Sequence, residues 1–255
     1  MTTPVRINSF DFPPGRKITA RYQVVSQLGA GWESEVYLIR ETATGIERTA
    51  KVFFPHRNRG NKVARRTAEK LHKLRDCPAL IQYVAQETIT VKRQPLTVLI
   101  SDYVEGDLLS DFIALQPGGR MHRFEALHLL RALALALEPI HDRREYHGDL
   151  HADNVIVQRV GLEFDVRLID LYHLNQRKSL SVKDDVCDAI RIFYDALGGQ
   201  RFYARQSPEI KAICRGLKRS LIYERFRNAG QLRRYLDTMP WHPERERAPA
   251  GKGRR

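Results

Sequence analysis

The sequence predicts an α+β fold with a strand-rich N-terminal part and a mainly helical C-terminal part. Apolar runs and alternation before residue 103 predict strands at residues 22–28, 35–39, 49–54, 89–91 and 96–100. A turn with two glycines separates the first two strands, which favours a hairpin and an antiparallel sheet. Beyond residue 103 the apolar residues follow helical spacing, most clearly over residues 124–141.

Composition indicates a globular protein without a membrane span. The chain has 255 residues and 42% hydrophobic content, enough for one large or two small domains. Its most apolar stretch, residues 126–140, is interrupted by charged residues and a proline, and residues 1–12 contain no signal-peptide core. The three cysteines show no metal-ligand spacing, so we expect buried free thiols and a cytoplasmic location.

The formal net charge of +13 favours an acidic partner. Many of the cations lie in residues 57–75 with helical spacing, which is typical of a solvated helix face. No aromatic interleaving or nucleic-acid motif accompanies them, so nucleic-acid binding is not expected. The last residues, 241–255, are rich in Pro, Gly and Arg and predict a disordered basic tail.

The stretch with the most chemistry is residues 147–154, HGDLHADN, followed by the apolar residues 155–157. Gly, Asp, Asn and His are weak helix formers, so this stretch predicts a loop that leads into a strand. Asp149 and Asn154 offer a proton acceptor and a metal or phosphate ligand five residues apart. The alternative is a solvated turn, because short polar motifs have many false matches.

A second feature is the turn between the first two strands, which contains Gly29 and Gly31 and has Trp32 and Glu33 at its tip. Two glycines one residue apart let backbone N–H groups approach a polyphosphate, although an ordinary turn has the same composition. Lys51 follows within residues 49–54, a predicted strand. A cation in a half-buried sheet needs an anion nearby, and this requirement supports a phosphate site.

In this order the motifs resemble those of the protein kinase superfamily. Gly29, Gly31 and Val36 match its Gly-rich loop, and Lys51 stands 22 residues after Gly29 (51 − 29), as in that family. The HGDLHADN stretch resembles the catalytic loop HRDxxxxN, with Gly148 in place of Arg. The residues of this stretch are also similar to those in the loops of aminoglycoside phosphotransferases and lipopolysaccharide-core sugar kinases.

The resemblance implies a two-lobed kinase fold. Residues 1–21 would form a leader, residues 22–103 an antiparallel-sheet N-lobe, and residues 104–240 a mainly helical C-lobe. Fourteen residues separate Asp170 from Asp185 (185 − 170 − 1), so the activation segment is expected to be shortened. Asp185 would begin a buried helix that runs to Gly199 and would tie down the catalytic loop.

The resemblance also assigns a nucleotide site to this chain. Glu69, on the helix expected at residues 61–75, would pair with Lys51 and orient it toward the phosphates. A surface pair with Arg65 or Lys73 is the alternative for Glu69. The expected ATP-binding residues are Gly29, Gly31, Val36, Thr49, Lys51, Glu69, Asp102, Val104 and Asp107.

For the reaction itself, the resemblance assigns catalytic roles to Asp149, Lys51 and His151. Asn154 and Asp170 would bind Mg²⁺, or Mn²⁺ in its place, because hard cations prefer oxygen ligands. Asp170 resembles the metal-binding Asp of the DFG motif, although Leu171 and Tyr172 replace Phe and Gly. His151 has a structural hydrogen-bonding role as its alternative.

The function implied is ATP-dependent phosphoryl transfer to Ser or Thr of a protein substrate. One alternative is a small-molecule kinase acting on a sugar or an aminoglycoside-type hydroxyl, which the HGDLH spelling and the short segment favour. A second alternative is a nucleotide-binding pseudokinase or interaction module.

Overall fold

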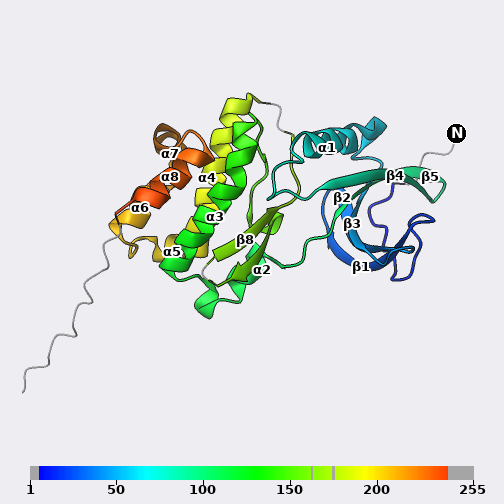
Figure 1. The fold of residues 1–255 in the computed structure, drawn as a ribbon, viewed down its shortest axis with the longest axis horizontal. Coiled ribbons are helices and arrows are strands. Elements are labelled where there is room, and N and C mark those ends of the chain that lie inside the picture. Colours follow the sequence, from blue (N-terminus) through cyan, green and yellow to red (C-terminus); the bar gives the residue numbers. More distant parts are fainter. Residues whose placement is uncertain (1–5, 162, 174–175, 241–255) are drawn as a thin grey trace, which may run out of the picture.

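The computed structural model, which describes residues 6–161, 163–173 and 176–240, has a sheet-based N-lobe and a helical C-lobe (Figure 1). The N-lobe sheet has the order β1-β2-β3-β5-β4 with every neighbouring pair antiparallel. Its strands are β1 (Tyr22–Ala30), β2 (Ser34–Glu41), β3 (Glu47–Phe53), β4 (Tyr83–Val91) and β5 (Gln94–Asp102). The antiparallel sheet expected from the sequence is therefore confirmed.

The chain before β1 is part of the N-lobe core. Residues 6–21 are largely irregular, as expected, but Ile7, Phe12 and Ile18 are buried and pack with apolar residues of the sheet. The ring of Phe12 stacks on Tyr37 at a centroid distance of 5.2 Å. The described part of the expected leader is thus packed against the domain, because its apolar side chains cover one face of the sheet.

Helix α1 (Lys62–Lys73) connects the two lobes (Figure 1). Ala64 packs with Phe53 and Leu99 of the N-lobe sheet. Two turns further on, Leu71 is buried in the core of the C-lobe, as is Leu74 just after the helix. Because its apolar residues reach both cores, the position of α1 depends on how the lobes sit against each other.

The C-lobe is mainly helical. Its regular elements are β6 (Asp107–Leu108), α2 (Leu109–Ala114), α3 (Arg123–Asp142), β7 (Val155–Val160), β8 (Glu163–Leu168), α4 (Lys178–Ala196), α5 (Gly199–Tyr203), α6 (Pro208–Cys214), α7 (Arg219–Arg225) and α8 (Ala229–Thr238). Short 3₁₀ turns of the C-lobe lie at 117–119, 152–154 and 215–217, and one in the N-lobe lies at 59–61, before α1. Helices α3 and α4 lie side by side at its centre, and the small sheet β6-β7-β8 flanks α3 on the side of the N-lobe (Figure 1).

Helix α3 confirms the helix expected over residues 124–141, and its buried residues form the middle of the C-lobe core. Helix α4 differs from the expectation, because it begins at Lys178 and Asp185 lies two turns inside it. Only nine residues separate β8 from α4 (178 − 168 − 1). The activation segment is therefore even shorter than the interval from Asp170 to Asp185 indicated.

Several expectations from composition can be compared with the structure. Cys77, Cys187 and Cys214 are buried free thiols, as expected. Within the described residues, no helix combines the length and the apolarity needed to cross a membrane. The expected basic tail, 241–255, lies outside the described residues.

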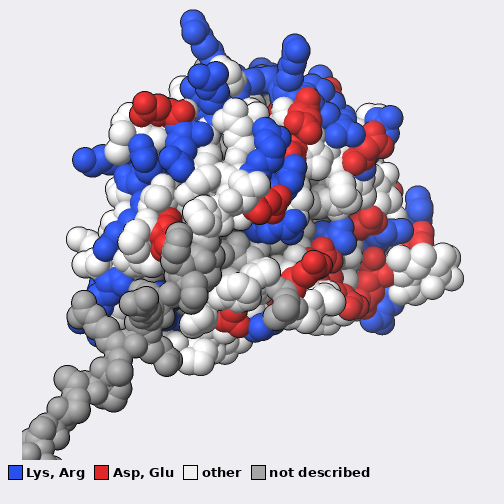
Figure 2. Space-filling model, turned by 60° about the vertical axis from the view of Figure 1, so that its left-hand side comes forward, with Lys and Arg blue, Asp and Glu red and all other residues white. Residues whose placement is uncertain are grey.

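Basic side chains form a surface band. Figure 2 shows Lys and Arg gathered along the upper edge of one face. On α1 and the turn before it, the exposed cations are Arg57, Arg59, Lys62, Arg65, Arg66 and Lys73. Lys70, on the same helix, departs from the expected solvated face because it is only 4% exposed.

Candidate active site

A cavity of about 660 Å³ lies between the N-lobe sheet and the C-lobe, and it brings the expected site residues together. The strands and their turn supply its roof, the segment after β5 supplies one wall, and the loops before β7 and after β8 supply the floor. The expected residues that line it are Gly29, Gly31, Val36, Thr49, Lys51, Asp102, Val104, Asp107, Asp149, His151, Asn154 and Asp170.

Lys51 projects from the middle of β3, where it lies opposite Val36 on β2 and Leu99 on β5. Its Nζ is 2.9 Å from Oδ1 of Asp170 and 3.0 Å from Oε1 of Glu33. Burial alone would lower the pKa of Lys51, but Asp170 and then Glu33 outweigh it and hold the pKa above its ordinary value. Lys51 is therefore a fixed positive charge inside the cavity.

The expected ion pair between Glu69 and Lys51 is not formed. Glu69 is exposed and does not line the cavity, whereas Thr67 and Leu71 of the same helix do. Successive residues of a helix are about 100° apart, so Glu69 points about 200° away from Thr67. The assignment of Glu69 is corrected by this helix register, which is set by the packing of Ala64, Leu71 and Leu74.

The segment after β5 forms the wall between the lobes. The N–H of Asp102 donates to the C=O of Gln82 at 3.0 Å, and its carboxylate pairs with Arg48 of β3. Val104 and Asp107 follow and line the cavity. Asp102 thus ties the end of β5 to two neighbouring parts of the N-lobe.

The loop of residues 147–154 is held in place by a buried carboxylate. Asp185, fully buried in α4, accepts hydrogen bonds from the N–H groups of His147 at 2.6 Å and Gly148 at 2.9 Å. Gly148 has a φ of +91°, and a Cβ there would lie 2.8 Å from the C=O oxygen of Tyr172. Glycine is required because both the backbone angle and the space exclude a side chain.

His147 links this loop to the strand that precedes Asp170. Its Nδ1 accepts from the N–H of Asp149 at 3.3 Å, so the ring proton is on Nε2, which donates to the C=O of Ile169 at 2.8 Å. Burial lowers the pKa of His147 and outweighs the opposing effects of Asp185 and the Ile169 carbonyl. His147 is therefore a neutral structural crosslink in the floor of the cavity.

Asn154 organises the loop around Asp149. Its Nδ2 donates to the C=O of Asp149 at 2.8 Å and to Nε2 of His151 at 2.9 Å. Since the amide nitrogen is occupied in this way, Oδ1 is the atom that Asn154 can offer to a cation. Asp149 and His151 remain half-exposed, with a separation of 3.8 Å between Oδ2 and Nε2. An acceptor carboxylate and an imidazole thus lie side by side at the mouth of the site.

Asp170 follows β8 in an unusual backbone conformation. Its φ is +58°, which is uncommon for a residue other than glycine and often marks a functional site. The N–H of Ile169, the residue before Asp170, donates to the C=O of Asn154 at 3.0 Å, so the segments that carry the two expected metal ligands are joined. Carboxylate and amide oxygens in one cavity fit a hard cation such as Mg²⁺.

Lys70 on α1 reaches across to this floor. Its Nζ donates to the C=O of Tyr172 at 2.7 Å and to that of His147 at 3.4 Å. It also lies 3.9 Å from the centre of the Tyr146 ring. Burial lowers the pKa of Lys70 to about 8. One buried amine on α1 therefore contacts both loops that form the floor of the site.

Glu33, Lys70 and Thr67 are site residues to which the sequence analysis gave no role. A buried lysine in a basic helix has no distinct sequence pattern, and a threonine that follows two arginines gives none either. Glu33 had one usable signal, an acid at the tip of a turn expected to approach phosphate.

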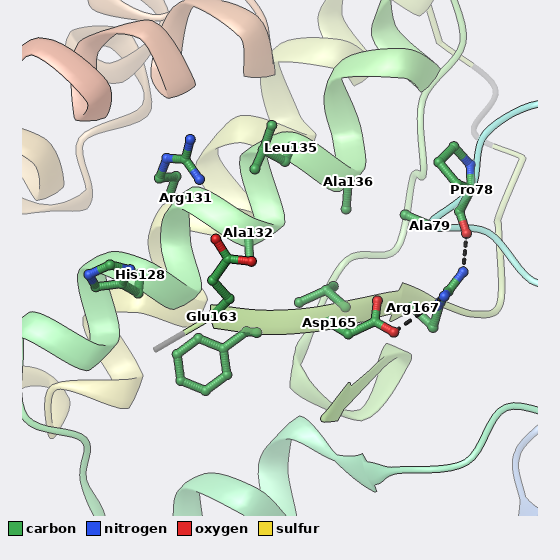
Figure 3. Close-up of a pocket in the computed structure, with 12 residues that line it drawn as sticks. Pro78, Ala79, His128, Arg131, Ala132, Leu135, Ala136, Glu163, Asp165 and Arg167 are labelled. Carbon is green, nitrogen blue, oxygen red and sulfur yellow. Dashed lines mark hydrogen bonds and ion pairs between the residues drawn. The ribbon is translucent and has the colours of Figure 1, made fainter. Parts of the chain in front are cut away.

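A second cavity, of about 300 Å³, lies between α3 and β8 on the C-lobe (Figure 3). Arg131 and Glu163 are among its lining residues, and Arg167 donates to the C=O of Pro78 at one end. None of the residues expected to bind nucleotide or metal lines it. The chemistry of the sequence motifs is thus confined to the cavity between the lobes.

Comparison with known proteins identifies the family. The family model of the protein kinase domain matches residues 22–190, more than half of the chain, and this range includes every residue that lines the cavity between the lobes. The chain belongs to the protein kinase family. The resemblance that the sequence motifs indicated is confirmed.

Curated kinases are similar to this kinase over part of their length. Serine/threonine-protein kinase PrkC of Bacillus subtilis (strain 168) is 26% identical over 151 residues, covering 58% of this chain and 22% of PrkC. Serine/threonine-protein kinase pkn2 of Myxococcus xanthus is 29% identical over 160 residues, covering 62% of this chain and 18% of pkn2. This kinase thus spans about a fifth of the length of these relatives.

Solved structures support the fold. The crystal structure of the Mycobacterium tuberculosis PknI kinase domain matches with a TM-score of 0.62 at 19% identity. The match covers 90% of this kinase and 98% of the PknI chain. The two-lobed kinase fold is therefore confirmed along nearly the whole chain.

Proposed function

We propose that this kinase transfers the γ-phosphoryl group of ATP to a Ser or Thr hydroxyl of a protein substrate. The observation that carries the proposal is that Lys51, Asp149, Asn154 and Asp170 border a single cavity of about 660 Å³. The names of the similar curated kinases support Ser or Thr as the acceptor. The residues required for turnover are all present, which disfavours a pseudokinase.

The nucleotide would lie under the turn of the N-lobe sheet. Gly29 and Gly31 would let backbone N–H groups approach the phosphates, and Lys51 would bind them. Asp102 and Val104 would offer backbone groups to adenine, and Asp107 would reach the ribose. Val36 and Thr49, which line the same cavity, would border the nucleotide.

Phosphoryl transfer needs a substrate hydroxyl in the correct position and groups that neutralise the negative charge of the phosphates. Asn154 and Asp170 would hold Mg²⁺, which when bound neutralises charge on the phosphate oxygens. Asp149 would accept the proton of the hydroxyl as its oxygen bonds to the γ-phosphorus and the bond to the leaving ADP oxygen breaks. His151, adjacent to Asp149, would contact the γ-phosphate.

The test is incubation of the full chain with Mg²⁺, γ-labelled ATP and a generic basic protein. We expect label on Ser or Thr, and loss of that label in Asp149→Asn and in Lys51→Met. ATP binding without label on protein would contradict the proposal. The same preparation would then be offered sugars and aminoglycosides, to test a small-molecule acceptor.

A further inference from the structure

Glu33 lies in the turn that joins β1 to β2. The N–H of Gly31 donates to the C=O of Ser34 at 2.9 Å and closes this turn around Glu33. The C=O of Glu33 accepts from the N–H of Phe54 at 2.9 Å, which fixes the turn to the end of β3. Lys51 lies in β3, three residues before Phe54. The hydrogen bonds of the main chain therefore hold Glu33 in a defined place relative to Lys51.

The side chain of Glu33 is directed into the cavity between the lobes. It is only 14% exposed, and its Oε1 lies 3.0 Å from Nζ of Lys51. Glu33 also lines the same cavity as the glycines of its turn. A buried carboxylate requires a partner of opposite charge, and Lys51 supplies it.

Lys51 contacts two carboxylates that differ in their surroundings. Asp170 is 40% exposed and is one of the two oxygen ligands proposed for a cation. Glu33 is more buried and comes from the turn in the roof of the cavity, whereas Asn154 and Asp170 come from the loops of its floor. When the oxygens of Asp170 serve another cation, Glu33 is the carboxylate that still holds Lys51.

Helix α1 does not provide this carboxylate. Thr67 and Leu71 are its residues that line the cavity, and Glu69 is exposed on another face. Lys70, the buried charged residue of α1, contacts backbone carbonyls of the C-lobe. Within the described residues, the carboxylates paired with Lys51 come from the turn before β2 and from the end of β8.

We propose that Glu33 is the positioning residue that holds Lys51 toward the phosphates of the nucleotide, in place of a carboxylate on α1. The proposal rests on the nucleotide site of the proposed function. Because Glu33 and the two glycines share one turn, the element that covers the phosphates also orients the lysine that binds them. The roof of the site and the phosphate-binding charge are therefore coupled.

The experiment measures the affinities of Mg²⁺·ATP and of adenosine by isothermal titration for the full chain and three variants. Glu33→Gln is expected to weaken ATP binding about tenfold, as for the loss of a charged hydrogen bond, and to leave adenosine binding within about twofold. Glu33→Asp keeps the carboxylate and is expected to recover most of the ATP affinity. Glu69→Gln is expected to bind both ligands like the wild type.

Three outcomes would overturn the assignment of Glu33. Equal weakening of ATP and adenosine would indicate a structural role, and tighter ATP binding would mean that Glu33 masks Lys51. A loss in Glu69→Gln that matches the loss in Glu33→Gln would return the role to α1. Binding does not depend on turnover, so the expected pattern without transfer to protein would support Glu33 while contradicting the proposed protein kinase activity.

Discussion

The carboxylate of Asp185 accepts a hydrogen bond from the N–H of His147 at 2.6 Å, although the two residues are 38 positions apart in the chain. A third partner completes the environment of Asp185, because Nε2 of His141 on α3 lies 3.1 Å from its Oδ2. Nδ1 of His141 accepts from the N–H of Ala229, so the proton of His141 is on Nε2 and faces Asp185. One buried carboxylate thus joins α3, α4 and the loop that carries Asp149.

Asp185→Asn is expected to lower the free energy of unfolding by about 2 to 4 kcal/mol, because an amide nitrogen replaces an accepting oxygen in a fully buried site. Urea unfolding measures this loss. Asp142→Asn, at an exposed position of α3, is the control for the same chemical change and should change stability by less than about 0.5 kcal/mol. Equal stability of the two variants would contradict the role given to Asp185.

Gly148→Ala is expected to destabilise the chain by about 2 to 3 kcal/mol more than Gly45→Ala. Both glycines have positive φ, +91° and +74°, so both substitutions strain the backbone. A Cβ at Gly148 also meets Tyr172 and Tyr146 within 3.0 Å, whereas a Cβ at Gly45 has open space. Thermal unfolding of the two variants separates the effect of the steric clash at Gly148 from the backbone strain that both substitutions cause. If both variants lose the same stability, the neighbouring residues move and the steric clash at Gly148 has no cost, which would contradict the prediction.

Lys70→Met is expected to lower phosphoryl transfer about tenfold and to change the free energy of unfolding by less than about 1 kcal/mol. The substitution removes two contacts to backbone carbonyls, but it also removes a charge that burial disfavours, as the pKa of about 8 indicates. Steady-state kinetics and urea unfolding measure the two effects. Lys62→Met, at an exposed position of α1, is the control. Wild-type turnover in Lys70→Met would contradict a link between α1 and the loops.

The candidate site could be predicted from the sequence where local patterns determine geometry. Lys51 lies in a strand, and antiparallel pairing places it opposite Val36 in the strand that follows the two glycines. Asp149 and Asn154 lie in one short loop, so their spacing alone brings them together. That the Asp149 loop meets Lys51 in one cavity is not local, because the two are 98 positions apart in the chain (149 − 51) and meet only when the two lobes pack together.

Glu69 and Glu33 could not be predicted in the same way. Whether Glu69 or Thr67 faces the cavity depends on the rotation of α1, which is set by packing against both lobes. Glu33 lies in a turn, where no alternation rule says which way a side chain points. The partner of Lys51 therefore depends on tertiary structure, although the lysine itself is recognisable in the sequence.

The raised pKa of Asp188 predicts how the free energy of unfolding depends on pH. Burial, helped by Asp185 and Asp184 against the opposing effect of Arg219, raises the pKa of Asp188 to about 7. Between pH 4 and 7 the folded chain therefore keeps a proton that the unfolded chain has lost, and the contribution of Asp188 to the free energy of unfolding falls as pH rises.

Asp188→Asn mimics the protonated form, so it is expected to be about 1 to 2 kcal/mol more stable than wild type at pH 8 and equal to it near pH 4. Thermal unfolding at both pH values measures the difference, and Asp142→Asn makes the same charge change at an exposed position. A gain that is the same at both pH values, or that Asp142→Asn reproduces, would show that the titration of Asp188 is not its cause.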